Sequence, residues 1–454
     1  MTSSPSSSPT EDPGRVPILQ LPLMRGLAFA EFFSSVGTTV VVLAIAFLSY
    51  DDSKSVVHTV LVSAAYSLPT AVLGMYAGRV AARVSHRKLL LTLNVLKLFV
   101  YLALTAMAAA DLLGVPELIV ASIVTGALSA FNSPAWMEFE RDVIPTDRLD
   151  EANAMFGAAS SAAAVVGAII GGVLLGTVGP WAMFLFDALS YVGFIWVLNR
   201  AHPVEVKTAS ATRTRLRDAV NYISQEPLRR RMFVRTAVLS LLVAPVSQLL
   251  PAVADDLDPG SAALGVLTGA FAVGALTLAY VIGRLKARYT SVAILNLTFL
   301  VSGVVLFVFG RFGDALEGQG LWVVVLVSLI PLGLLLALAQ SVLAGGVEMR
   351  VAPEMEGAVF ALYAIVYTVL APLGGIALGQ FADANDVWDA LTLSGGFVVV
   401  ASAVALAFWH RPVDDVEPDP HPRARHIPLD SILRNHVLHL QRWHRPSRTS
   451  PPDP

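Results

Sequence analysis

The chain contains no cysteine and few charged residues. Of its 454 residues only 14% are Asp, Glu, Lys or Arg, whereas 55% are hydrophobic and the mean hydropathy is +0.66. The absence of cysteine excludes disulfides, thiolate metal sites and a cysteine nucleophile. A typical soluble domain has about 25% charged residues, so this composition predicts a membrane protein.

The sequence also lacks the motifs of nucleotide-driven and hydrolytic proteins. It has no Gly-x4-Gly-Lys-Ser/Thr loop, and neither a His-Glu-x-x-His nor a Gly-x-Ser-x-Gly motif. These absences argue against ATP-driven transport by this chain alone and against an intramembrane hydrolase. We expect no enzymatic activity, no cofactor and no metal site.

Long apolar runs are abundant. About 20 apolar residues are needed to cross about 30 Å of hydrocarbon. Twelve runs satisfy this length, and they cover residues 26–49, 56–78, 89–110, 117–137, 152–176, 180–199, 232–254, 262–283, 290–310, 321–345, 356–382 and 387–409.

The positive charges predict the orientation of these spans. If both termini face the same side, the segments on that side hold 27 of the Lys and Arg residues, and the segments on the other side hold only Lys54 and Arg311. Cytoplasmic loops carry the excess of Lys and Arg. We therefore expect both termini in the cytoplasm and acidic outer loops.

Three sequence echoes indicate a tandem duplication. GRVAAR (78–83) returns as GRLKAR (283–288), ERDVIP (140–145) returns as EMRVAP (348–353), and GAIIGG (167–172) is echoed by APLGG (371–375). Each pair falls at equivalent places of two six-span repeats. Repeats of this kind are typical of secondary transporters.

The same reading divides the chain into five parts. A disordered cytoplasmic tail (1–24) precedes the first six-span half (25–199), and a cytoplasmic linker (200–231) leads to the second half (232–410) and a basic cytoplasmic tail (411–454). In the linker, Leu216, Val220 and Ile223 recur at helical spacing, which predicts an amphipathic helix on the inner leaflet or a solvated linker helix.

Twelve spans, a 6+6 repeat, a basic turn after the second span and a glycine-rich fifth span resemble the major facilitator superfamily. Residues 145–192 and 353–383 resemble its macrolide-efflux-like branch of drug:proton antiporters. The resemblance covers about residues 25–410. It implies an all-α membrane protein with 12 transmembrane helices in two pseudo-repeated six-helix halves.

The chain departs from two motifs of that family. In the first basic turn Gly78, Arg83, Arg87 and Lys88 fit, but Ala82 replaces the family's Asp. The resemblance implies a conformational-switch loop there, and its remaining candidates, which come from the turns after the fourth and tenth spans, are Glu140, Arg141, Glu348 and Arg350. Acids at 138, 140, 354 or 356 could take the place of the missing Asp.

The antiporter motif of the fifth span is also incomplete. Ala168 stands where the family has Pro, which removes any bend that the Pro would set. Close packing through small residues survives this change. The helix-packing glycines that we expect are Gly167, Gly171, Gly172, Gly374 and Gly375.

Ionisable residues inside the spans are functional candidates by default. Glu31 could bind a proton or a cationic substrate, or could be hydrated near the inner face. Lys97 is expected to extend toward the cytoplasmic face, as long charged side chains do. Asp187 is a further candidate for proton coupling, although a packing or hydrogen-bonding role suits it better, and Arg235 suits an interfacial anchor.

Neutral polar residues within the spans could line a substrate cavity or could form hydrogen bonds between helices. They are Tyr66, Asn132, Asn153, Gln248, Gln340, Tyr363 and Tyr367. A cavity with few charges and many aromatic groups suits a bulky, amphipathic ligand.

The C-terminal tail is rich in histidine and arginine. Leu429, Leu433 and Leu440 form one face of a predicted helix, which favours an amphipathic helix on the inner leaflet. The alternative, a metal site through the tail histidines, is disfavoured because acidic partners and cysteines are missing.

Three functions remain open at this stage. The first is an exporter of an amphipathic, drug-like molecule that works by alternating access and is coupled to protons. The second is an exporter of a siderophore or lipid-like metabolite, and the third is a transport-inactive sensor or scaffold on the same fold. The expected partners are the lipid bilayer of a bacterial inner membrane, a small-molecule substrate and protons, with no nucleic acid; the oligomeric state stays open.

Overall fold

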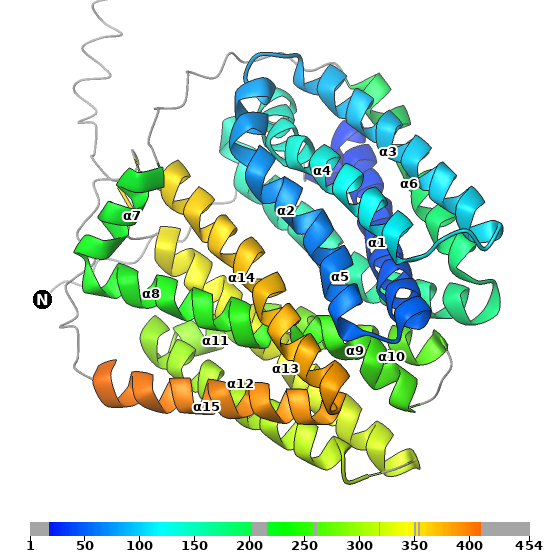
Figure 1. Ribbon diagram of the computed structural model, residues 1–454. Coiled ribbons are helices and arrows are strands. Elements are labelled where there is room, and N and C mark those ends of the chain that lie inside the picture. The colour runs from blue at the N-terminus through cyan, green and yellow to red at the C-terminus, as the bar shows by residue number, and fades with distance from the viewer. Residues whose placement is uncertain are drawn as a thin grey trace, which may run out of the picture. The chain divides into compact units, whose positions relative to one another are not determined.

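The computed structural model describes residues 18–201, 216–257, 261–316, 318–348, 351–352 and 355–409. Within these ranges the only regular elements are helices (Figure 1). The described residues from Ile18 to Leu406 belong to one compact unit. Residues 1–17 of the predicted N-terminal tail, residues 202–215 of the linker, Arg350 and the C-terminal tail lie outside the described residues. The expectation that the tail is disordered as far as residue 24 is wrong for its last part, because residues 18–24 form a 3₁₀ turn and the first residues of α1, with Ile18 and Met24 buried against the bundle.

Six long helices form the first half of the bundle. They begin and end at the following residues: α1 Pro22–Ser53, α2 Val56–Ala81, α3 His86–Ala109, α4 Val115–Val143, α5 Leu149–Thr177 and α6 Pro180–Arg200. Prolines occupy the first turn of several of these helices, where a backbone N–H has no helical partner to lose. Short 3₁₀ turns, Ile18–Gln20 and Thr146–Arg148, precede α1 and α5.

The second half also provides six spans, but two of them are broken. Its helices are α8 Pro227–Val238, α9 Val246–Leu257, α10 Ser261–Leu276, α11 Leu278–Lys286, α12 Ser291–Gly313, α13 Gly318–Glu348, α14 Glu356–Ala384 and α15 Val387–Trp409. A π-helix, η3 (Leu239–Val243), connects α8 to the segment before α9, and Thr277 separates α10 from α11.

Twelve helical segments are long and apolar enough to cross a membrane, which confirms the twelve predicted spans. Two of them, Arg229–Leu257 and Ala262–Lys286, are these broken spans. Pro245 explains one break, because proline has no N–H to donate to the carbonyl of Leu241. The continuous helix expected over 232–254 is therefore interrupted near its middle.

The two halves pack against each other through few helices. In Figure 1, α14 runs beside α2, and the same two helices are in contact in the structure. α10 contacts α5 in the same way, and one apolar core cluster contains residues of both halves. Successive spans alternate in direction, so the loops gather at two ends. We call them the Lys54 end, which holds the α1–α2 loop, and the linker end, which holds the connection between the halves.

A short helix of the linker, α7 (Leu216–Gln225), is strongly amphipathic. Its residues Ala219 and Ile223 are buried in a cluster with Val359 of α14, whereas Val220 is exposed. Part of the apolar face of this helix therefore packs on α14, and its contact with the inner leaflet stays a prediction. The Tyr222 hydroxyl accepts a hydrogen bond from the backbone N–H of Ala352 at 3.0 Å, which fixes α7 to the segment before α14.

Candidate functional site

Three ionisable side chains of the first half come from helices that pack together, and we call them the charge cluster. Glu31 lies on α1, Lys97 on α3 and Asp187 on α6, and α6 contacts both other helices. Lys97 lies 11 residues after the start of α3, or about 16 Å along the helix axis. The sequence supplies these residues singly, and only the packing of three helices brings them together.

Asp187 is the most enclosed member of this charge cluster. Its side chain is 0% exposed, and a side chain at Gly37 of α1 would overlap its carboxylate. The Ser190 hydroxyl donates a hydrogen bond to Asp187 Oδ1 at 3.3 Å. Within the described residues, Oδ2 is buried without a partner of normal hydrogen-bond geometry. The Tyr191 hydroxyl, one helical turn further along α6, is a further polar neighbour of this carboxylate.

Tyrosines surround the charges. The rings of Tyr101 and Tyr191 stack with their centroids 5.8 Å apart, and the Lys97 ammonium lies 5.9 Å from the centroid of the Tyr191 ring. This position contradicts the expectation that Lys97 extends toward the membrane surface. Such a cation–π contact is worth about 2 kcal/mol or more when it is desolvated. Lys97 therefore stays inside the helix bundle because a partner ring is available there.

Glu31 is less enclosed than Asp187. The Ser35 hydroxyl donates a hydrogen bond to Glu31 Oε1 at 3.2 Å. Glu31, Ser35, Thr38 and Val42 recur at intervals of four and three, so they share one face of α1. Thr38 is exposed and Val42 is 61% exposed, so protein does not cover this face further along the helix.

The polar candidates of the second half form a separate group. Gln340 of α13 donates a hydrogen bond to the Tyr367 hydroxyl of α14 at 2.7 Å. Tyr363 packs edge-on against Phe233, with the ring centroids 6.4 Å apart. Helices α13, α14 and α8 thus present phenol, amide and aromatic groups to one another.

The broken span contributes Gln248. Its amide oxygen is buried without a hydrogen-bond partner among the described residues, and it lies against Gly375 of α14 and Val60 of α2. π-Helical turns and interrupted helices are frequent at functional sites. Gln248 therefore sits where the two halves touch.

Four predicted polar residues fall elsewhere. Tyr66 of α2 is 40% exposed, and its carbonyl lies against Gly126 of α4. Asn132 is half-buried on α4, and Asn153 is exposed near the start of α5. Arg235, expected to be an interfacial anchor, is 6% exposed and donates a hydrogen bond to Asn296 Oδ1 at 2.5 Å, so that expectation is wrong.

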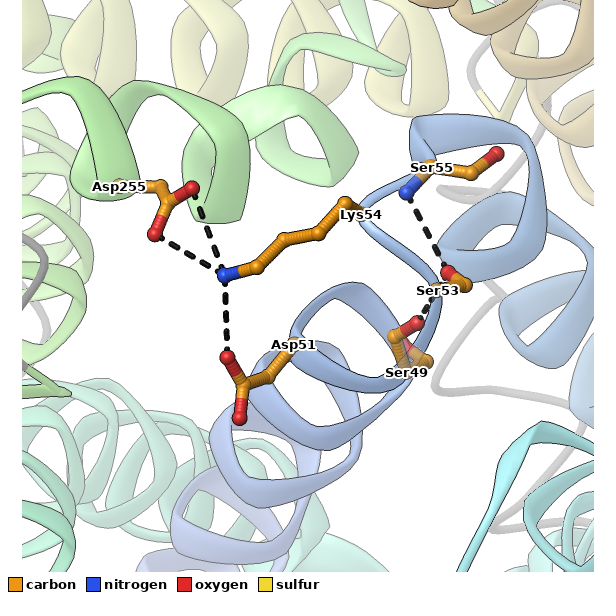
Figure 2. Close-up of polar contacts among 6 residues, drawn as sticks. All are labelled: Ser49, Asp51, Ser53, Lys54, Ser55 and Asp255. Carbon is orange, nitrogen blue, oxygen red and sulfur yellow. Dashed lines mark hydrogen bonds and ion pairs between the residues drawn. The ribbon is translucent and has the colours of Figure 1, made fainter.

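An ionic contact joins the halves at the Lys54 end (Figure 2). The Lys54 ammonium donates to Asp51 Oδ1 at 3.0 Å and to Asp255 Oδ1 of α9 at 3.2 Å. Lys54 terminates α1 in a left-handed conformation, with φ of 48°. Hydrogen bonding to Asp51, opposed by partial burial and reinforced by Asp255, raises the pKa of Lys54 above its ordinary value.

A second contact at this end caps a helix of the other half. The carboxylate of Asp383, near the end of α14, accepts hydrogen bonds from Ser55 Oγ at 2.5 Å, from Val56 N at 2.8 Å and from Val57 N at 3.4 Å. These groups form the N-terminus of α2, where unpaired N–H groups and the helix dipole favour an anion. Sequence reasoning missed both contacts; the one signal was a single lysine among acidic outer loops.

Glycines show that the halves are packed closely at the Lys54 end. A Cβ atom at Gly172 of α5 would lie 2.9 Å from the Cα atom of Gly265 in α10, and one at Gly379 would lie 3.2 Å from Val57 N. Glycines near the linker end have open space instead: an added Cβ at Gly78, Gly157 or Gly283 would meet nothing within 4 Å. The close glycine contacts between the halves therefore lie toward the Lys54 end.

The predicted packing glycines all lie at close helix contacts. Gly167 faces Thr39, Gly171 faces Leu43, and Gly374 faces the carbonyl of Leu241. Gly172 and Gly375 lie between the halves, as described above. Ala168, which replaces the Pro of the family motif, is fully buried opposite Gly269, and α5 runs on as one helix through it.

The predicted switch loop is anchored within the first half. Arg87 donates to the carbonyl oxygens of Leu198 at 2.7 Å and Asn199 at 2.6 Å, which satisfies the end of α6. His86 pairs with Asp142 of α4 at 2.6 Å. A role of this loop in switching stays a prediction.

The other switch-loop candidates lie around it or beyond it. Arg83 and Lys88 are exposed, Glu140 is buried, and Arg141 pairs with Glu138 at 3.3 Å. Glu348 is the last residue of α13, and Arg350 lies outside the described residues. No group of His, Asp and Glu that could hold a metal ion occurs in the part of the chain that the structure describes.

Comparisons with known proteins agree on the architecture. Residues 16–436 match a family model described as "Transmembrane secretion effector". The nucleoside transporter NupG is similar in structure, with a TM-score of 0.69 and 14% sequence identity over 86% of this chain and 99% of that chain. No curated protein matches the sequence.

Two further solved structures are similar. A bacterial homologue of the iron transporter ferroportin in an inward-facing state has a TM-score of 0.65 and 14% identity over 85% of this chain and 98% of that one. A transporter of the POT family in complex with a thioalcohol-conjugated peptide has a TM-score of 0.67 and 13% identity over 85% and 96%. At these identities the likeness establishes the fold alone.

Proposed function

Because the chain belongs to the transmembrane secretion effector family of major facilitator transporters, we propose that it exports an amphipathic small molecule by alternating access, driven by inward movement of protons. Its location would be a bacterial inner membrane. The linker end would face the cytoplasm, since the Lys and Arg residues concentrate in the loops of that end. The Lys54 end would then face outward.

One observation carries this proposal: the ion pair, the helix cap and the glycine contacts that join the halves in the described part of the chain lie toward the Lys54 end. Asp255 and Asp383 of the second half hold the α1–α2 loop, while glycines at the opposite ends of α2, α5 and α11 have open space around them. A transporter of two repeats that rock against each other passes through such a state. The site would then be open to the cytoplasm, which is where an exporter loads its substrate.

The two groups of polar residues supply the chemistry of transport. The charge cluster of the first half provides carboxylates that can exchange protons, and Glu31 is the one on an uncovered helix face. The aromatic and amide groups of the second half, Gln340, Tyr363 and Tyr367, suit a bulky molecule with few charges. Proton binding at one group and substrate binding at the other would give antiport.

The test is transport by the purified protein in proteoliposomes with an imposed pH gradient. The probes are ethidium and a bisbenzimide dye, with an amphipathic siderophore as a second arm for the metabolite class. We expect Glu31→Gln to abolish pH-driven uptake and to leave the elution of the folded protein unchanged. Glu117→Gln, at an exposed carboxylate of the Lys54 end, is the matched control.

If Glu31→Gln transports as the wild type does, Glu31 is not the coupling residue. If neither class of probe moves under any gradient, the substrate class is wrong.

A further inference from the structure

The aromatic group of the second half lies next to the linker helix. Tyr363 of α14 packs against two separate apolar clusters, and among the described residues it is the one partly buried side chain that does so. One is the large core cluster that both halves share. The other, which we call the α7 cluster, consists of Ala219 and Ile223 of α7, Val351 before α14, and Ala358 and Val359 of α14. Tyr363 therefore joins the linker helix to the core.

One face of α7 forms its side of this cluster. Ala219 is fully buried and Ile223, one helical turn further along, is 6% exposed, whereas Val220 is 50% exposed. The helix has only ten residues, and isolated helices of this length are marginal in water. The helical form of α7 therefore depends on its packing against α14.

Tyr222 ties α7 to two neighbouring segments. Its hydroxyl accepts the hydrogen bond from Ala352 N, at 3.0 Å, on the segment before α14. The guanidinium of Arg229, in the first turn of α8, lies 3.7 Å from the centroid of the Tyr222 ring, and Arg229 also pairs with Glu226 at 2.6 Å. A hydrogen bond and a cation–π contact thus hold α7 between the start of α8 and the segment before α14.

The helices that flank α7 carry the residues proposed to bind substrate. Phe233 of α8 packs edge-on against Tyr363. Tyr367 follows Tyr363 by one helical turn of α14, and its hydroxyl accepts the hydrogen bond from Gln340. Without α7, the Tyr363 ring would lose part of its packing and gain rotamer freedom. The order of this ring therefore depends on the linker.

We propose that Ile223 and Tyr222 are positioning residues that hold Tyr363 in the substrate site of the second half, so that the linker contributes to substrate binding and is not only a tether. This inference rests on the proposed binding of substrate by Gln340, Tyr363 and Tyr367. A ring that is already ordered loses less conformational entropy when a substrate binds. Removal of its support should weaken binding and leave the later steps of transport unchanged.

The packing is tested first and without a substrate. Because the chain has no cysteine, Leu362→Cys introduces a single thiol beside the α7 cluster, where Leu362 is partly buried. The rate of its reaction with N-ethylmaleimide is measured on the protein in nanodiscs. We expect Ile223→Ser to raise this rate by about tenfold or more, because burial of an isoleucine side chain is worth at least a factor of about ten in an equilibrium. Val220→Ser, a similar change on the exposed side of α7, is the matched control and should leave the rate unchanged.

Transport gives the second readout. KM and kcat for the bisbenzimide dye are measured in proteoliposomes with an imposed pH gradient, on variants without the added thiol. Ile223→Ser should raise KM by about 2–10-fold, which is the range of one aromatic contact, and leave kcat unchanged. Ile223→Leu keeps the apolar side chain and should behave as the wild type. Tyr222→Phe removes only the acceptor of the Ala352 hydrogen bond, so it should act in the same direction to a smaller extent, and it replaces Ile223→Ser if that variant does not fold.

The labelling rate and KM separate packing from binding. An unchanged labelling rate in Ile223→Ser would overturn the support of α14 by α7, and equal effects of the two serine variants would overturn its assignment to the buried face. Faster labelling with an unchanged KM would make α7 a tether and overturn its part in binding. A wild-type protein that moves no dye refutes the proposed function and the part of α7 in binding with it, whereas the labelling rates still decide whether α7 supports α14.

Discussion

The contact of Asp383 with the N-terminus of α2 gives the sharpest prediction for closure of the Lys54 end. Asp383→Ala removes the acceptor of three hydrogen bonds, to Ser55 Oγ, Val56 N and Val57 N, and the charge that favours the helix N-terminus. A charge-assisted hydrogen bond contributes about 1.5–3 kcal/mol and a helix N-cap about 0.5–2 kcal/mol. Because Asp383 is exposed, water replaces part of these interactions in the variant. We therefore expect Asp383→Ala to lower the stability of the closed arrangement by about 1–2 kcal/mol.

This loss applies only to the closed arrangement, since the two halves separate when the Lys54 end opens. One to two kcal/mol corresponds to a factor of about 5–30 in an equilibrium. Asp383→Ala should therefore raise the open-to-closed ratio by about 5–30-fold. The ratio is measured by electron–electron distance spectroscopy with a spin-label pair introduced by Leu112→Cys and Phe312→Cys, at exposed sites of the Lys54 end of a chain that has no cysteine.

Asp386 offers a matched control in the same loop. Its Oδ1 accepts a hydrogen bond from Trp388 N at 2.8 Å, so it caps α15 within its own half. Asp386→Ala should destabilise that helix end and leave the distance distribution unchanged. The reasoning fails if the two alanine variants open the Lys54 end equally, or if Asp383→Ala has no effect.

Three further perturbations probe the same closure. Gly172→Val should hold the Lys54 end open and stop transport, because its side chain has no room beside Gly265, whereas Gly193→Val, where a Cβ would meet nothing within 4 Å, should have no effect on distances. Gln248→Met should raise the closed-to-open ratio by about 5–150-fold, because it removes a buried carbonyl whose missing hydrogen bond costs about 1–3 kcal/mol; an unchanged ratio would show that the carbonyl is hydrated. Lys54→Met should open the Lys54 end at neutral pH, and the wild-type contribution of Lys54 should stay constant between pH 6 and pH 9. A lysine whose pKa is raised stabilises fully below its ordinary pKa of about 10.4 and loses this effect only as the pH rises through the raised value, so a Lys54-dependent change within that range would contradict the assignment.

The membrane spans could be predicted because hydropathy over about 20 residues is a strong signal. The interruption of the span over residues 229–257 could not, although Pro245 stands in the sequence, since prolines are common in membrane helices and many leave them continuous. Pro69, Pro134 and Pro331 lie within unbroken helices of this same chain. What differs at Pro245 is the packing of Gly374 against the freed carbonyl of Leu241, which is a contact between distant segments.

The sequence predicts which residues belong to the candidate site, but it does not predict which side chains lie next to them. Glu31, Lys97 and Asp187 stand out as ionisable residues in apolar runs, but the sequence does not tell that Lys97 lies over Tyr191 or that Gly37 covers Asp187. Helix periodicity fixes which residues of one helix share a face; it does not fix which faces of three helices meet. The same limit hid the contacts of Lys54 and Asp383, whose partners are 201 and 328 residues away.

The ionic contact of Lys54 and the buried charge cluster are expected to respond differently to pH. Lys54 stays protonated throughout the physiological range because its pKa is raised, so its bond to Asp255 cannot report a change of pH there. Any dependence of opening on neutral pH must then arise elsewhere, and the buried carboxylates of the first half are the groups that we propose for it. If Glu31→Gln removes the pH dependence while Lys54→Met only shifts the open fraction equally at every pH, the closure and the proton site are separate elements of one cycle.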